Sequence, residues 1–360
     1  MKFVNGLSVE VTQKCNSHCR YCFSESSPLT CKEIPFAKLV DVIEQYLTLE
    51  NKLVYDALEN KRLKSQLVIT GGEFFLHSQW KKLLEYLTDR SIEFDTATNG
   101  ILLNDDMIEF LGKTSVNDFQ ISLDGLKKEE NALRNPLYLE TIIDNIKKVA
   151  ESPLRERTTI KATVTKYNIN AVSGLVQFCE ENGLRLIFGY VQVLGRAAHH
   201  HEYILSADEI KEFNINIVEN YPKIVLPLMF SHAPCPLDVE EEPLAFRIAA
   251  NGDIFPCASF HEDFFVIGNI YDCSLQEAIN SEKFKKIQAW VKERKNRMIS
   301  DKCVNCYVAD FCQGSCPAAS YYEMGDVYAP VRRICDAAKG FNYYMLPKLF
   351  KEKVKLTDRR

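Results

Sequence analysis

The 360-residue chain contains no apolar run that approaches the roughly 18 residues needed for a membrane-spanning helix. Residues 1–13, MKFVNGLSVEVTQ, lack the apolar stretch of a secretory signal. Positive charge is not in excess, because 44 Lys and Arg face 49 Asp and Glu, and this balance argues against nucleic acid as the main partner. With 46% apolar residues, the chain can form a sizeable core. We therefore expect a globular cytoplasmic protein that neither enters a membrane nor binds nucleic acid.

The cysteine content is unusually high, with thirteen cysteines in the chain. Three of them form a C-x3-C-x2-C pattern at Cys15, Cys19 and Cys22, and seven more form a second set between residues 235 and 335. The total is odd, and a reducing cytoplasm disfavours disulfides. Short cysteine spacings in such a chain predict bound metal instead.

Alternating strand and helix patterns dominate the first 225 residues. Strands are expected at 6–12, 65–70, 92–98, 117–125, 158–165 and 184–192, and helices at 36–50, 80–90, 105–113, 139–151 and 170–183. This order predicts an α/β fold with a parallel sheet, open or closed as a barrel, whose chemistry lies at the carboxyl ends of the strands. The cysteine loop and the motifs GGE (71–73), TNG (98–100) and SLDG (122–125) all follow strands.

The pattern changes after about residue 225. A Pro-rich segment is followed by an expected hairpin at 244–257, turning at Asn251-Gly252, and by an amphipathic helix at 274–295 that is expected to be interrupted. We place a domain boundary here, which gives a core domain at 1–225, a small cysteine-ligated α+β domain at 226–345 and a polar tail at 346–360.

The first cysteine loop offers an incomplete ligand set. Three thiolates hold three corners of a 4Fe–4S cube and leave one iron open, and an open metal position is where a substrate or cofactor binds. With the aromatic Tyr21 before its last cysteine, and with GGE, TNG and SLDG following in order, the loop resembles that of the radical S-adenosylmethionine (radical SAM) superfamily. The resemblance implies a partial (β/α)6 barrel and a cluster on these three cysteines. S-adenosylmethionine would chelate the open iron and be cleaved to a 5′-deoxyadenosyl radical that abstracts hydrogen from the substrate.

The resemblance also implies roles for residues that follow the strands. Glu73 would accept from the methionyl ammonium, and the glycines before it would let backbone groups approach the ligand. The implied cofactor-binding residues are Tyr21, Gly71, Gly72, Glu73, Asn99 and Ser122, and Asp124 is a candidate for proton transfer. Taken alone, GGE could be an ordinary turn, and Asp124 could be a turn residue before Gly125. Phe74 departs from the Pro that usually follows GGE in the family.

The second cysteine set resembles the SPASM domain of radical SAM peptide-modifying enzymes, which carries two auxiliary 4Fe–4S clusters. The resemblance implies a distal cluster on Cys303, Cys306, Cys312 and Cys335, and a proximal cluster on Cys235, Cys257 and Cys316. The proximal cluster then has an open iron or a further ligand, for which Cys273 is an outside candidate. A zinc ribbon is the alternative, but it leaves three cysteines unused. Cys31 and Cys179 fit no motif, and we expect both to be packed thiols.

The implied function is that of a maturase that abstracts hydrogen from a ribosomally made peptide. The product would carry a thioether or C–C cross-link or an oxidised residue. Alternatives are formation of an aldehyde residue as in sulfatase maturases, modification of a small molecule such as a tetrapyrrole, and a non-catalytic iron–sulfur electron carrier. The expected partners are the peptide and an external electron donor of the flavodoxin or ferredoxin type. Only fourteen residues precede Cys15, so we expect a separate protein, the barrel or the SPASM domain to hold the precursor.

Overall fold

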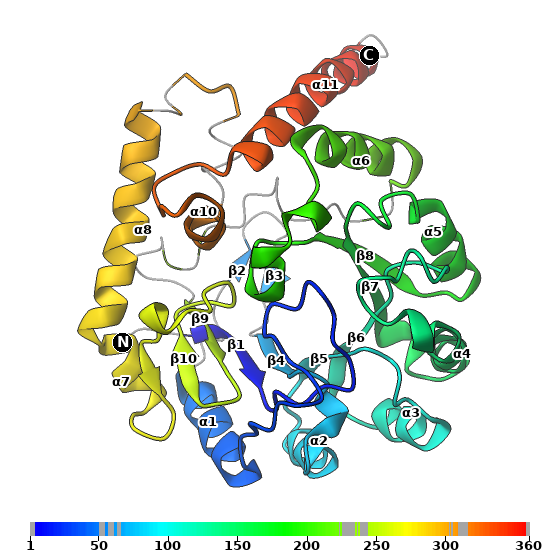
Figure 1. The fold of residues 1–360 in the computed structure, drawn as a ribbon, viewed down its shortest axis with the longest axis vertical. Helices are drawn as coiled ribbons and strands as arrows, with labels where there is room; N and C mark the ends of the chain where they lie inside the picture. Colours follow the sequence, from blue (N-terminus) through cyan, green and yellow to red (C-terminus); the bar gives the residue numbers. More distant parts are fainter. Residues whose placement is uncertain are drawn as a thin grey trace.

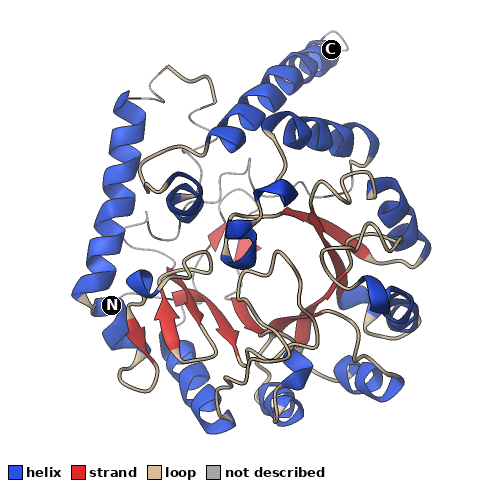
Figure 2. Ribbon diagram, in the orientation of Figure 1, coloured by secondary structure: helices blue, strands red, loops and turns tan. Residues whose placement is uncertain are grey.

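The structure, a computed structural model, describes residues 4–49, 55–56, 61–62, 66–222, 224, 235, 237, 244–301, 303, 305–308 and 316–357. A curved sheet lies at the centre, with helices along its outer side (Figures 1 and 2). Its nine strands follow the order β11-β10-β9-β1-β4-β5-β6-β7-β8. Among the described residues, no helix is long and apolar enough to cross a membrane.

Six neighbouring strands of this sheet are parallel, as the α/β pattern predicted. They are β1 (Val4–Glu10), β4 (Gln66–Thr70), β5 (Phe94–Thr98), β6 (Val116–Ser122), β7 (Thr158–Val164) and β8 (Arg185–Tyr190). A separate two-stranded ribbon consists of β2 (Tyr55–Asp56) and β3 (Lys61–Arg62). Parallel pairing requires crossover connections, and helices supply most of them here.

The helices of the first half cover the outer face of the sheet and leave its inner face to the barrel interior (Figure 1). They are α1 (Phe36–Leu49), α2 (Trp80–Asp89), α3 (Asp105–Gly112), α4 (Leu139–Ala150), α5 (Val172–Glu181) and α6 (Ala207–Asn220). In α4, Ile142, Ile146 and Val149 are buried at helical spacing, so one stripe of the helix packs on the sheet. Short 3-10 turns lie at η1 (Phe74–Leu76), η2 (Pro136–Tyr138), η3 (Arg155–Arg157), η4 (Gly195–His199), η5 (His201–Tyr203) and η7 (Asp263–Phe265).

The predicted hairpin of the second half extends the same sheet. Strand β9 (Leu244–Ile248) pairs with β10 (Asp253–Phe255) antiparallel, and β10 pairs with β11 (Gly268–Asn269). The hairpin turn holds Gly252 at φ +91°, a conformation that favours glycine. On its other edge β9 lies parallel to β1, so one sheet crosses the boundary that the sequence suggested near residue 225.

A buried ion pair fastens this junction. Arg247 of β9 donates to Glu10 of β1 at 2.8 Å, and both side chains are buried. The same guanidinium donates to the carbonyl of Phe260 at 3.0 Å and lies 4.1 Å from the ring centre of Phe255. Burial raises the pKa of Glu10, and Arg247 opposes that rise. The pair therefore ties the cysteine-rich half to the first strand of the barrel.

The remaining helices are α7 (Leu275–Asn280), α8 (Glu282–Asp301), α10 (Pro317–Met324) and α11 (Arg332–Thr357). Helices α7 and α8 correspond to the expected interrupted helix, with Ser281 between them. Most of the expected polar tail is helical, because α11 continues past Pro347 through a run of good helix formers, KEKVKL. Helix α11 packs against α6, where Tyr344 donates to Glu219 at 2.5 Å.

Replacing Arg247 with Met should leave the Glu10 carboxylate buried without its cation. We expect the free energy of unfolding to fall by about 3 to 5 kcal/mol. A double variant, Glu10→Leu with Arg247→Met, removes both charges and should recover most of that loss. Urea unfolding of the full chain measures both, and a single variant as stable as the parent would contradict the role given to this pair.

Candidate functional site

The backbone just before the cysteine loop contacts the GGE motif at the end of β4. Gly72 donates its N–H to Thr12 at 2.8 Å, and Glu73 donates its N–H to Lys14 at 2.8 Å. A Cβ on Gly72 would lie 2.5 Å from the Lys14 carbonyl oxygen, and one on Gly71 would lie 2.7 Å from that of Thr12. In the structure, the absence of side chains at Gly71 and Gly72 lets the backbone of the cysteine loop pack against them. The contact of these glycines with the cofactor stays a prediction.

The segment after β8 makes a second set of contacts with the cysteine loop. The Arg196 side chain donates to the carbonyls of Cys19 (2.8 Å) and Ser26 (2.9 Å). Gly195 before it has φ +52°, and a Cβ there would lie 2.4 Å from the Phe23 carbonyl oxygen. Sequence reasoning missed this contact. The available signal was a Gly-Arg pair shortly after the last barrel strand, at the catalytic edge.

The three thiols share one environment. Burial raises the pKa of Cys15 to about 12, and the thiols of Cys19 and Cys22 add to the rise. Burial also raises the pKa of Cys19, whereas the guanidinium groups of Arg134 and Arg196 oppose it. Iron is bound by thiolate, so these two cations favour the cluster-binding form of Cys19. The donor set therefore fits three ligands of a 4Fe–4S cluster.

Among the described residues, no three His, Cys, Asp or Glu side chains are placed to hold a single metal ion. The ligands of a 4Fe–4S cube each bind a different iron and surround a larger body than one ion.

Glu73 and Asn99 link two strand ends to the cysteine loop. The buried Glu73 carboxylate accepts from the Thr98 hydroxyl at 2.9 Å and from the Asn99 N–H at 2.8 Å. Burial raises its pKa to about 7 although these hydrogen bonds lower it. The Asn99 side chain in turn donates to Asn16 at 2.7 Å and to Ser17 at 3.2 Å. An acidic group is thus fixed beside the thiols, where an ammonium could bind it.

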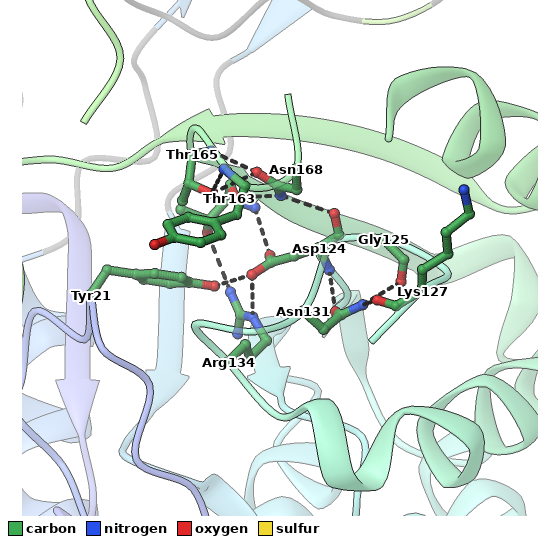
Figure 3. A network of polar contacts seen from close by, with 10 residues as sticks. Tyr21, Asp124, Gly125, Lys127, Asn131, Arg134, Thr163, Thr165 and Asn168 are labelled. Carbon is green, nitrogen blue, oxygen red and sulfur yellow. Dashed lines mark hydrogen bonds and ion pairs between the residues drawn. The ribbon is translucent and has the colours of Figure 1, made fainter. Parts of the chain in front are cut away.

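Asp124 forms the centre of a polar network on the next strand ends (Figure 3). One carboxylate oxygen accepts from the Thr163 N–H at 2.9 Å, and the other accepts from Arg134 at 3.2 Å and from the Tyr21 hydroxyl. Both oxygens are therefore occupied, and the side chain is buried. Asn131 donates to the Gly125 carbonyl at 2.7 Å and so shapes the turn after Asp124.

Arg134 is the charged member of this network that the sequence did not predict; Thr163 and Asn131 were not predicted either. Its guanidinium lies 5.3 Å from the ring centre of Tyr21. Burial alone would lower the pKa of Arg134, but Asp124 and Tyr21 raise it, so it stays charged. Burial raises the pKa of Tyr21, which keeps its hydroxyl a donor. Ser122, also predicted, ends β6 opposite Lys161 of β7.

In the second cysteine set, Cys235, Cys257 and Cys316 lie near one another. Burial raises the pKa of Cys257 to about 12, and the thiols of Cys316 and Cys235 raise it further. The thiol of Cys273 lies against the backbone of β11, 3.5 Å from the Asn269 carbonyl oxygen. This neighbourhood contains the three residues expected for the proximal cluster.

Cys306 and Cys335 share another neighbourhood, because both raise the pKa of Lys339. The N–H of Cys306 donates to the carbonyl of Cys303 at 2.9 Å. Cys312, the fourth expected ligand of the distal cluster, lies outside the described residues. The division into two clusters therefore stays a prediction.

The two cysteines outside all motifs behave differently from each other. Cys179 is buried in α5, as a packed thiol should be. The same expectation is wrong for Cys31, which is exposed. It follows the turn at Ser27 to Thr30, where the chain runs along the surface before α1.

Comparison with known proteins gives two family matches. Residues 9–179 match the model of the radical SAM superfamily, and residues 241–307 match SPASM, an iron–sulfur cluster-binding domain. Mycofactocin maturase MftC of Mycolicibacterium smegmatis is 23% identical over 329 residues, covering 88% of this chain and 79% of MftC.

Two solved structures are similar in fold. Streptococcus suis SuiB bound to its precursor peptide SuiA has a TM-score of 0.70 at 18% identity, over 93% of this chain and 76% of SuiB. The anSMEcpe structure with bound AdoMet and the Cp18Cys peptide has a TM-score of 0.75 at 17% identity, over 98% of this chain and 99% of that one. At such identities the likeness establishes the shared architecture.

Replacing Gly72 with Ala should force the cysteine loop away from the sheet. The new Cβ meets backbone rather than a flexible side chain, so we expect a loss of about 1 to 3 kcal/mol in stability and a lower iron content at the first cluster. Gly112→Ala is the matched control, because a Cβ there meets nothing within 4 Å. Iron and sulfide assays measure the cluster content of the two variants, and thermal unfolding measures their stability. Equal iron content in the two variants would refute the role of Gly72 in packing against the cysteine loop.

Proposed function

Because this chain belongs to the radical SAM superfamily of enzymes and carries a SPASM domain, we propose that it is a maturase that modifies a peptide by hydrogen abstraction. The radical SAM domain binds S-adenosylmethionine and a 4Fe–4S cluster, and the SPASM domain binds auxiliary iron–sulfur clusters. When bound, these groups supply a 5′-deoxyadenosyl radical and an electron-transfer route. The observation that carries the proposal is the fixed Glu73 carboxylate beside three clustered thiols.

The residues of the first site have two binding roles, one toward the cluster and one toward S-adenosylmethionine. Cys15, Cys19 and Cys22 hold the cluster, and Glu73 provides the negative charge for the methionyl ammonium. Asn99 fixes Glu73 through its N–H and the cysteine loop through its side chain, so the two binding groups keep one relative position.

We assign Asp124 a positioning role in place of the proton transfer first considered for it. Its two oxygens already accept from Thr163, Arg134 and Tyr21, which leaves it poorly placed to take up a further proton. The network holds Tyr21, and with it the middle of the cysteine loop, against β6 and β7. Ser122 stays a candidate contact for the cofactor.

The SPASM residues would hold two further clusters in the partition given above, distal on Cys303, Cys306, Cys312 and Cys335 and proximal on Cys235, Cys257 and Cys316. Three ligands at the proximal cluster would leave an iron able to take a substrate thiolate. The shared sheet and the Glu10–Arg247 pair hold this domain against the barrel.

A peptide is the substrate class with most support. MftC and SuiB are named as a maturase and as a protein bound to a precursor peptide, and both resemble this chain over most of its length. A thioether or C–C cross-link and an oxidised residue stay open as products. We also propose an external electron donor of the flavodoxin or ferredoxin type. We propose a separate leader-binding protein as a further partner.

The direct test is anaerobic incubation of the reconstituted chain with dithionite and S-adenosylmethionine. We expect 5′-deoxyadenosine, and none from a Cys15→Ala variant, because that variant lacks one corner of the cluster. A non-catalytic electron carrier would give no 5′-deoxyadenosine in either case, and that result would reject the proposal. Liquid chromatography with mass detection measures the product.

Replacing Glu73 with Gln keeps the size of the side chain and removes its charge. We expect S-adenosylmethionine to bind more weakly by about 2 kcal/mol or more, since one partner of a buried charge pair is lost. Glu85→Gln on the exposed side of α2 is the control. Anaerobic equilibrium dialysis measures the dissociation constants, and unchanged binding by the Glu73 variant would exclude the ammonium contact.

A further inference from the structure

Lys161 lies in the middle of β7 and faces the barrel interior. Its neighbours Ile160 and Ala162 are fully buried under the helices, so Lys161 is on the opposite, inner face together with Thr159 and Thr163. Lys161 keeps substantial solvent exposure although it stands between strands on both sides. The interior of the barrel is therefore open to solvent at this lysine.

Strand β8, next to β7, leaves open space beside Lys161. Lys161 is in register with Ile187 of β8, and Thr163 is in register with Gly189. A Cβ built on Gly189 meets no atom within 4 Å, so the inner face of β8 borders open space there. On the other side Lys161 is in register with Ser122, which ends β6. We call the open region beside Lys161 and Gly189 the lumen site.

The charged groups above and below the lumen site are already paired. Asp124 above accepts from Arg134, and Asp118 below accepts from Arg185 at 2.7 Å and from Thr159 at 2.7 Å. Among the described residues, the Lys161 side chain has no hydrogen bond or ion pair, and only its backbone is paired. Its ammonium is the cation of this region that still lacks a counter-ion within the described part of the chain.

The surroundings make the lone ammonium unfavourable. Burial and the nearby Arg134 lower the pKa of Lys161, and only Asp118 raises it. A bound anion would oppose the effect of Arg134, because it places a negative charge beside the ammonium. A carboxylate fits a single lysine as a point-charge partner.

We propose that Lys161 binds a carboxylate of the substrate, so that the peptide presents an Asp, Glu or C-terminal carboxylate next to the residue that reacts. The lumen site lies level with Ser122 at the end of β6, next to β8, which is the edge strand of the sheet. This inference rests on the proposed function and narrows its substrate class to acidic peptides.

Acetylation of the lysines tests the proposal without requiring turnover. The full chain, with its clusters reconstituted anaerobically, is treated with sulfo-NHS-acetate, and modification of Lys161 is followed by peptide mass spectrometry. The probe is N-acetylglutamic acid α-amide, and its matched control is N-acetylglutamine α-amide. Exposed Lys166, on the loop after β7, is the internal reference.

We expect the acid probe to slow acetylation of Lys161 about tenfold relative to the amide probe, and to leave Lys166 unchanged. Gly189→Leu should abolish this protection by filling the open space, and an unchanged melting temperature would show that the variant is folded. Equal effects of the two probes on Lys161, or protection that survives Gly189→Leu, would overturn the proposal.

The carboxylate that binds Lys161 could also be that of S-adenosylmethionine. Repeating the labelling with S-adenosylmethionine and with its decarboxylated analogue tests this alternative. Protection by S-adenosylmethionine alone, with none by the acid probe, would assign Lys161 to the cofactor and overturn the substrate role. Acetylation of Lys161 does not depend on cleavage of S-adenosylmethionine. A negative result in the acetylation experiment therefore leaves the 5′-deoxyadenosine test of the proposed function unaffected. A missing 5′-deoxyadenosine signal would in turn leave the lumen site intact and reject only the proposed function.

Discussion

The site depends on a direct backbone contact between the cysteine loop and the end of β4. Gly72 and Glu73 donate their N–H groups to the carbonyls of Thr12 and Lys14, and the contact is possible only because residues 71 and 72 carry no side chain. The next residue, Glu73, is thereby fixed beside Cys15. One short motif thus sets both the position of the loop and the position of the acid that faces it. The clamp from Arg196 and the network around Asp124 hold the same loop from two other strand ends.

The second constraint is the continuity of the sheet. Strand β9 pairs with β1, the strand that leads directly into the cysteine loop, so the two cysteine-rich regions share one rigid support. The buried Glu10–Arg247 pair lies within this junction. Such a pair is costly to desolvate, so it adds little net stability, yet the loss of one partner is strongly destabilising. A fixed spacing between the sites is what electron transfer between clusters would require.

Much of the fold was predictable from local patterns. The six parallel strands and the hairpin at Gly252 follow from alternation, helical period and turn residues, which each segment carries within itself. The cysteine spacing and the GGE motif predicted the candidate site because each of these motifs also lies within one short segment. What could not be predicted is contact between distant segments: Arg247 and Glu10 are 237 residues apart, and Arg196 and Cys19 are 177 apart. Arg134 was missed although it lies only ten residues from Asp124, because its pairing depends on how the turn folds. The need for glycine at residues 71 and 72 is likewise visible only in the structure, where the backbone of the cysteine loop packs against them.

The central claim is that the first cysteine loop leaves one iron of its cluster open for S-adenosylmethionine. Electron–nuclear double resonance on the reduced, reconstituted chain tests it directly, with S-adenosylmethionine carrying nitrogen-15 in its amino group. The account predicts a hyperfine coupling between that nitrogen and the cluster, as expected for direct ligation to iron. A cluster signal with no such coupling, in a sample to which S-adenosylmethionine is demonstrably bound, would contradict it.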